Sequence, residues 1–329
     1  MEKLFKLKEH GTDVKTEIIA GITTFLAMAY ILAVNPSYLG GIDGMSAGAV
    51  FSATAISAGI ATLCMAFFAN YPVALASGMG LNAFFAFTVC GAMGYSYKVA
   101  LTAVFIEGII FMLLSLFKFR EALVNKIPSN LKFAITAGIG LFIAIIALLN
   151  ANVVVASEST TVALGELSSP TVVLSLVGLL IIGALQHYKV PGGILLGILI
   201  TWVLGIIAQL VGWYVPNPEA GVYSVIPQFS LSSFEAPKMF QFDFGFIAKN
   251  VPAFILIVFT FLYTDIFDTV GTLIGVAEKG KLLDKDGSLP NATGALMADA
   301  VGTVVGACFG TSTVTSYVES SAGVAAGGR

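Results

Sequence analysis

VPAFILIVFTFLYTDIFDTVGTLIGV (251–276) is apolar apart from a few hydroxyls and two carboxylates, Asp265 and Asp268, and it is long enough to cross a bilayer as one helix. A charged side chain near the bilayer centre costs at least about 2.5–3.5 kcal/mol on insertion scales, so such residues normally face a bundle interior or a watery cavity. The spacing i, i+3 puts both acids on one helix face, and Phe261 and Thr272 continue that face. This face is predicted to look inward at something polar.

The composition indicates a polytopic membrane protein. The chain is 57% hydrophobic and 11% charged, and its mean hydropathy is +0.93, whereas a soluble domain has roughly 25% charged residues. No basic stripe with interleaved aromatic residues predicts nucleic-acid binding. The sequence has no phosphate loop, and Cys64, Cys90 and Cys308 lack metal-ligand spacing, so no cofactor or metal is expected.

Apolar runs of about 20 residues predict ten membrane segments. They are approximately 16–37, 47–70, 72–95, 97–117, 131–150, 171–188, 190–213, 247–276, 292–309 and a tenth that begins near 311. With the N-terminus in the cytoplasm, twelve Lys and Arg residues fall on the cytoplasmic side and three on the outer side, as the positive-inside rule expects. The sequence therefore predicts a multi-pass protein of the cytoplasmic membrane with polar connections 151–170 and 214–246 outside.

The two halves of the chain resemble each other. TTFLAMAYI (23–31) aligns with FTFLYTDIF (259–267), and GAVFSATAISAGIATLC (48–64) aligns with GALMADAVGTVVGACFG (294–310), both at an offset of about 240 residues. A duplicated unit of seven segments would give this offset, and chance similarity between Ala- and Gly-rich helices is the alternative. An odd number of spans inverts the second copy and places a substrate at the repeat interface near the membrane midplane. On this hypothesis, the second copy would extend about 100 residues beyond the last residue.

The third and tenth segments are interrupted. NYPVALASGMGLNAFFAFTV (70–89) and CFGTSTVTSYVESSAGVAAGG (308–328) each predict a short extended stretch followed by a half-helix. The free N–H groups and positive dipole end of a half-helix suit a polar ligand. Helix packing through small residues would also enrich Gly, Ala and Ser. Asn82 and Glu319, one at each break, favour a binding site instead.

Five motifs in order resemble the purine permeases of the AzgA-like branch of the nucleobase–cation symporter-2 (nucleobase–ascorbate transporter) family. They are TTFLAMAYILAVNP in the first segment, GMGLNAFFAFTV in the third, DIFDTVGT in the eighth, ADAVGT in the ninth and GTSTVTSYVESSAGVAAGGR in the tenth. The resemblance covers essentially the whole chain. It implies an all-α polytopic membrane fold of fourteen segments in two inverted repeats of seven.

In that family, segments 1–4 and 8–11 form a core domain, and segments 5–7 and 12–14 form a gate through which members dimerise. The resemblance therefore implies that residues 1–117 and 247–329 belong to the core and residues 118–246 to the gate. Segments 11–14 would then be absent from this chain, which alone would not transport.

The resemblance also implies roles for single residues. Asp265 is similar to the substrate-binding acid of segment 8, and Glu319 to the residue of segment 10 that faces it across the purine. Asn82 matches a site asparagine, Asp299 an acid that supports the site, and Asp268 a structural or proton-coupling acid. Family substrates are hypoxanthine, guanine and sometimes adenine, moved inward with protons, so the expected function is proton-coupled purine uptake by an elevator-like, alternating-access mechanism.

Purine chemistry fits these residues without the family. Carboxylates accept from purine N–H groups, half-helix amides donate to purine acceptors, and Phe84, Phe85 or Phe261 can stack on the ring. Thr272 lies on the face of the two acids as a supporting residue. Such a pocket accommodates the six-oxo edge of hypoxanthine and guanine or the amino edge of adenine. A membrane carboxylate can carry a proton, and sodium coupling is the alternative.

Three other functions stay open. The same fold can carry other nucleobases, such as uracil or xanthine. It can also carry anions, which would favour basic groups at the two breaks. An intramembrane aspartyl hydrolase would need two acids on facing helices about 3 Å apart, whereas Asp265 and Asp268 lie on one helix.

Overall fold

The protein was analysed as a computed structural model. The structure describes residues 5–116, 137–138, 140–141, 144–145, 147–157, 160–188, 190, 192–216, 224–226, 235–284 and 289–329. Two compact units make up the chain: Met1–Gly138 together with Phe234–Arg329, and Ile139–Ser233.

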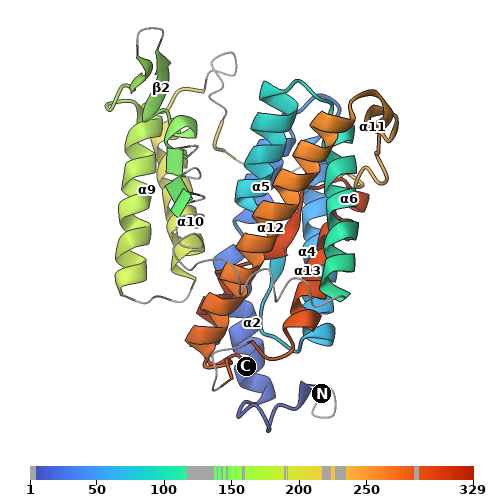
Figure 1. Ribbon diagram of the computed structural model, residues 1–329. Helices are drawn as coiled ribbons and strands as arrows, with labels where there is room; N and C mark the ends of the chain where they lie inside the picture. The colour runs from blue at the N-terminus through green and yellow to red at the C-terminus, as the bar shows by residue number, and fades with distance from the viewer. Residues whose placement is uncertain are drawn as a thin grey trace. The chain divides into compact units, whose positions relative to one another are not determined.

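The first unit is a bundle of long helices (Figure 1). They are α2 (Val14–Met28), α3 (Ile31–Leu39), α4 (Ala47–Phe68), α6 (Tyr97–Leu116), α12 (Val251–Gly280) and α13 (Ala292–Phe309), with the short α11 (Gly245–Lys249) before α12. α2 begins where Oδ1 of Asp13 accepts a hydrogen bond from the Thr16 backbone N–H at 2.9 Å, and this bond holds the pKa of Asp13 below its usual range. α13 packs against both α4 and α6, and α12 packs against α6.

Both interrupted segments contain the extended stretch that the sequence predicts. In the third segment, β1 (Leu75–Ser77) leads into α5 (Met79–Ala83) and the π-helix η1 (Phe84–Ala92). In the tenth, β4 (Val314–Ser316) leads into α14 (Ser320–Ala325). β1 and β4 pair antiparallel, with Ala76 opposite Thr315. Equivalent strands of two inverted copies would meet in this orientation.

Glycine residues allow α13 to approach its neighbours closely. A Cβ atom on Gly302 would lie 2.7 Å from the Cβ of Ala61 on α4, and one on Gly306 would lie 2.7 Å from Cγ2 of Val314 on β4. Neither position could hold a larger residue without displacing its neighbour. The β1–β4 pair is therefore held tightly against α13, and all six strand residues are buried.

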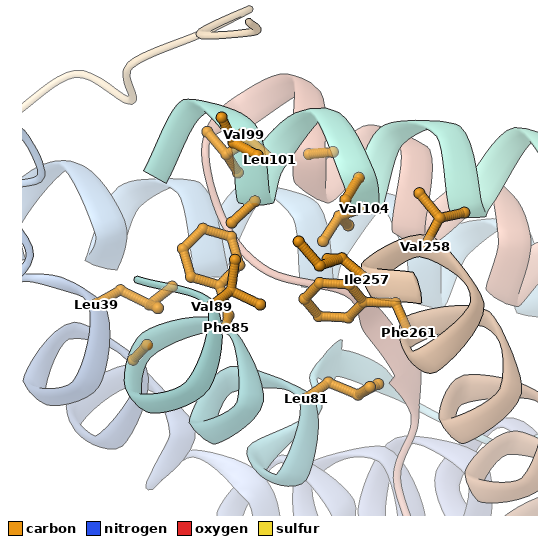
Figure 2. Close-up of a cluster of buried hydrophobic side chains, with 14 of the residues drawn as sticks. Leu39, Leu81, Phe85, Val89, Val99, Leu101, Val104, Ile257, Val258 and Phe261 are labelled. Carbon is orange, nitrogen blue, oxygen red and sulfur yellow. The ribbon is translucent and has the colours of Figure 1, made fainter. Parts of the chain in front are cut away.

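Three buried apolar clusters form the described core of this unit, and two of them include residues of α12. The first joins α6, α12 and the third segment, and Figure 2 shows Val104, Ile257 and Phe261 converging in it. The second includes Leu273 of α12 together with residues of α4, α6 and α13. Along α12, Asp265 lies between Phe261 of the first cluster and Leu273 of the second. The predicted acidic face therefore begins where one apolar cluster ends.

The second unit contains two helices and a hairpin. α9 (Pro170–His187) packs against α10 (Gly193–Leu210), and β2 (Val154–Ser157) pairs antiparallel with β3 (Thr161–Leu164). The hairpin occupies part of the 151–170 connection, for which the sequence analysis predicted no strands. The predicted segment 131–150 lies partly outside the described residues.

Seven helices in the described part of the chain are long and apolar enough to span a membrane: Val14–Leu39, Ala47–Phe68, Tyr97–Leu116, Pro170–His187, Gly193–Leu210, Val251–Gly280 and Ala292–Phe309. The first of these combines α2 and α3. The two interrupted segments and 131–150 are the three other predicted spans. The chain is a multi-pass membrane protein.

Candidate functional site

The two carboxylates of α12 have different surroundings. Asp265 is fully buried, and its Oδ1 lies 3.4 Å from the Thr269 hydroxyl oxygen. Asp268 is only half-buried and interacts electrostatically with Glu319 of the tenth segment. Residues three apart on a helix differ in direction by about 60°, which is enough to turn one acid into the bundle and the other toward a neighbouring element. Asp268 is thus an α12 acid within electrostatic reach of Glu319.

Asp299 on α13 connects three elements. Its Oδ1 accepts from both the backbone N–H and the hydroxyl of Ser316 on β4, each at 2.8 Å, and its Oδ2 accepts from the Thr269 hydroxyl at 2.8 Å. The Thr269 hydroxyl also lies 2.9 Å from that of Thr315. Asp299 is fully buried. Its contacts hold the extended part of the tenth segment against α12 and α13.

Glu319 comes directly before α14 and contacts the first segment. Its Oε1 accepts a hydrogen bond from the Tyr30 hydroxyl, and Tyr30 lies between α2 and α3, where the first segment is interrupted. Tyr317 lies nearby, interacts electrostatically with Tyr30, Asp268 and Glu319, and donates its hydroxyl to the Ser77 carbonyl at 2.5 Å. The segments that carry these residues come from both halves of the sequence.

Tyr30, Tyr317 and Glu107 are not among the site residues predicted from the sequence. Tyr30 stands in the TTFLAMAYI motif (23–31). The feature that could have identified it is a hydroxyl group in the middle of an otherwise apolar run. Tyr317 stands two residues before Glu319. Glu107 is a carboxylate within the apolar α6 and is fully buried. A carboxylate in a membrane segment has a high insertion free energy, and the same argument that singled out Asp265 applies to Glu107.

Asn82 is a buried amide on α5. Among the described residues, neither its Oδ1 nor its Nδ2 has a hydrogen-bond partner, and the side chain is fully buried. An unsatisfied buried polar group costs about 1–3 kcal/mol. An amide that can both donate and accept is suited to the edge of a heterocycle.

Phe84 and Phe261 form an edge-to-face pair. Their ring centroids lie 4.9 Å apart at an interplanar angle of 77°, and Phe85 lies behind them with its centroid 6.5 Å from that of Phe261. Phe261 is fully buried and Phe84 is half-buried. Phe84 can therefore present a ring face to a ligand, while Phe261 supports it from the core.

The half-helix ends differ from the prediction in one respect. The N–H groups of Ser320, Ser321 and Ala322 donate to the carbonyls of residues 317, 318 and 319, so the first turn of α14 does not offer free donors. The expectation of free amides in the tenth segment is wrong, because the chain tightens there into i→i+3 turns. In the third segment, the first helical bond of α5 runs from Asn82 N to Gly78 O, and no side chain caps the N-terminus. The backbone N–H groups that precede Asn82 in α5 therefore do not take part in the i→i−4 hydrogen bonds of the helix.

Thr272 is half-buried one turn after Asp268 on α12. No cluster of three or more metal-ligating side chains occurs within the described residues. A cavity of about 720 Å³ is lined mainly by apolar residues of α2, α3, α4 and the approach to β1, and none of the predicted site residues lines it.

Curated proteins of similar sequence are permeases. The Methanocaldococcus jannaschii protein named "Putative permease MJ0326" is 47% identical over 329 residues, covering 100% of this chain and 72% of the relative. The adenine permease AdeQ of Escherichia coli K12 is 44% identical over 329 residues, covering 100% of this chain and 71% of the relative. The guanine/hypoxanthine permease PbuO of Bacillus subtilis 168 is 46% identical over 333 residues, covering 99% of this chain and 73% of the relative.

Solved structures of similar fold are transporter membrane domains. The transmembrane domain of the cyanobacterial bicarbonate transporter BicA matches with a TM-score of 0.66 at 17% identity, covering 96% of this chain and 78% of that chain. The murine anion transporter Slc26a9, in its inward-facing state, matches with a TM-score of 0.61 at 11% identity, covering 96% of this chain and 54% of that chain. These likenesses concern the fold alone, and they confirm the predicted inverted-repeat transporter fold with core and gate domains.

The family comparison agrees with the five motifs. The permease family Xan_ur_permease matches residues 15–329, which is nearly the whole chain. The predicted resemblance to nucleobase permeases is thereby confirmed, and this chain belongs to the permease family Xan_ur_permease.

Proposed function

We propose that this protein takes up purine nucleobases across the cytoplasmic membrane: hypoxanthine, guanine and, as the name of AdeQ suggests, adenine. The observation that carries the proposal is the meeting of Asp268, Glu319 and Tyr30, on three separate segments, beside the broken parts of the chain. A purine offers N–H donors on its edge, and two carboxylates at one place are acceptors for them. Phe84 supplies an aromatic face for the plane of the ring.

The direct acids in this proposal are Asp268 and Glu319. The family resemblance implies the α12 role for Asp265, but its full burial beside Thr269 favours a place for Asp265 behind the ligand. Asn82 completes the polar rim from the third segment. Phe261, Asp299 and Thr272 support these groups.

The experiment that tests this proposal is uptake of labelled hypoxanthine by the full-length protein in cells that lack their own purine permeases. Unlabelled guanine and adenine should compete, and uracil, xanthine and bicarbonate should compete poorly. Strong competition by uracil or xanthine would assign the protein another nucleobase. Uptake of bicarbonate in place of hypoxanthine would favour an anion, as in the named activity of the BicA transporter.

Transport is proposed to be coupled to protons. Four carboxylates, Asp265, Asp268, Asp299 and Glu319, lie in or beside the eighth to tenth segments, while 251–276, 292–309 and 311–328 contain no Lys or Arg. A carboxylate of this group can bind a proton at the outer face and release it at the inner one.

Uptake is then expected to fall as external pH rises and to collapse when a protonophore is added. The measurement is initial uptake of labelled hypoxanthine at several external pH values, with and without sodium. Accumulation that survives the protonophore and disappears without sodium would contradict proton coupling, while leaving the purine site intact.

The domain arrangement proposed for the function is a core of residues 1–117 and 247–329 that carries the site, and a gate of residues 118–246. In an elevator-like cycle, the core moves its site past the gate, and the gate of one copy associates with that of a second copy. This arrangement, in which the protein is a transporter and not a hydrolase, is supported by the family membership of the chain.

The N-terminus is proposed to be cytoplasmic. A single cysteine at Ser168, in the 151–170 connection, is expected to react with an impermeant thiol reagent added outside intact cells, and one at Lys281 is not. The background for both should lack Cys64, Cys90 and Cys308, which are free thiols. Equal labelling of the two positions, or labelling of Lys281→Cys alone, would overturn this orientation.

A further inference from the structure

Tyr30 is the residue of the first segment that reaches the acidic pair. α2 ends at Met28 and α3 begins at Ile31, so the tyrosine stands at the break between them. Its ring packs against an apolar cluster that includes Ala76 of β1 and Tyr317. Because Ala76 belongs to the third segment and Tyr317 to the tenth, the ring is held by the two broken segments.

The hydroxyl of Tyr30 donates to Oε1 of Glu319. A glutamate side chain has three rotatable bonds, and ordering it on binding lowers affinity. A hydrogen bond from a fixed tyrosine removes that freedom before the ligand arrives. A carboxylate has two oxygens and several lone pairs, so one held by Tyr30 can still accept from a ligand N–H.

We propose that Tyr30 is a positioning residue that fixes the carboxylate of Glu319 for substrate, so that affinity for the purine depends on the break in the first segment. This inference rests on the proposed function. It assigns to Tyr30 no contact with the purine itself. Its effect is on binding: a residue that orients an acceptor equally in the bound state and in the transported state changes KM and leaves the maximal rate nearly unchanged.

The test is Tyr30→Phe, which keeps the ring and removes only the hydroxyl. We expect KM for hypoxanthine uptake, and Kd measured on the purified protein, to rise about tenfold, with the maximal rate within about twofold of the unaltered protein. The melting temperature without purine should stay within a few degrees, since the ring still fills its apolar site.

Tyr71→Phe is the matched control. The Tyr71 hydroxyl donates to the carbonyl of Pro290, away from the acids, so its loss removes one hydrogen bond without touching Glu319. Its KM should stay within about twofold.

Three outcomes would contradict the inference. An unchanged KM and Kd in Tyr30→Phe would overturn it and leave the proposed function standing. A fall in maximal rate and melting temperature at constant Kd would show that Tyr30 only stabilises the fold. Failure of the unaltered protein to bind any purine would overturn the proposed function, and this inference with it.

Discussion

Replacing Asp268 by Asn is expected to lower purine uptake by at least about 100-fold, and Glu319→Gln is expected to do the same. Each change replaces a charged acceptor with an amide that also presents donors toward the N–H groups of the purine. The two acids come together from α12 and the tenth segment, so neither can substitute for the other. Uptake and purine binding should be measured on protein confirmed to be in the membrane.

Two variants distinguish the loss of a purine contact from a general loss of folding or stability. Asp43→Asn alters an exposed acid away from the site and should leave uptake unchanged. Asp265→Asn keeps an acceptor for Thr269 and should reduce uptake less than about tenfold, mainly through stability. If Asp265→Asn abolished binding and Asp268→Asn did not, the original assignment from the sequence would be right.

Asp299→Ala should have the largest effect on stability. It leaves the Ser316 N–H and the Ser316 hydroxyl without their shared acceptor in a fully buried place, while the Thr269 hydroxyl keeps Thr315 and Asp265 as neighbours. At about 1–3 kcal/mol for each unsatisfied buried group, the melting temperature should fall by about 10 °C or more. Thermal unfolding of the purified protein measures this directly.

The control is Asp299→Asn, whose Oδ1 can still accept from Ser316. It should retain most of the stability and lose less than half as much in melting temperature. An Asp299→Ala protein as stable as the unaltered one would show that these bonds do not hold β4 in place.

The interrupted segments could be predicted because their sequence departs from helical chemistry. Pro72 and the run Gly-Met-Gly in the third segment disfavour a continuous helix, and the β-branched Thr and Val residues of the tenth favour a strand. Their mutual register could not be predicted. It depends on which residues meet across about 240 positions of sequence, and only the pairing of Ala76 with Thr315 in space reveals it.

The different surroundings of Asp265 and Asp268 on α12 could not be predicted either. Periodicity places Asp265 and Asp268 on one face, but that face is wide, and its two edges meet different neighbours. Thr269 and Asp299 enclose one edge, and Glu319 lies at the other. Those neighbours come from other segments, so a pattern within one helix carries no information about them.

The contact between Tyr30 and Glu319 could not be predicted from the sequence for the same reason. A tyrosine in an apolar helix usually packs its ring in the core and finds any hydroxyl acceptor nearby. Its acceptor is Glu319, on a segment 289 positions away in the sequence. The i→i+3 turns at the start of α14 also could not be predicted from the sequence. Ser-Ser-Ala-Gly is compatible with both an i→i+3 turn and an ordinary α-helical turn.

A structure of the full-length protein with hypoxanthine bound tests the central claim most directly. The account predicts purine nitrogens within about 2.7–3.2 Å of carboxylate oxygens of both Asp268 and Glu319, with the ring against Phe84. A purine bound in the apolar cavity lined by α2, α3 and α4, or held without either of these two carboxylates, would contradict it.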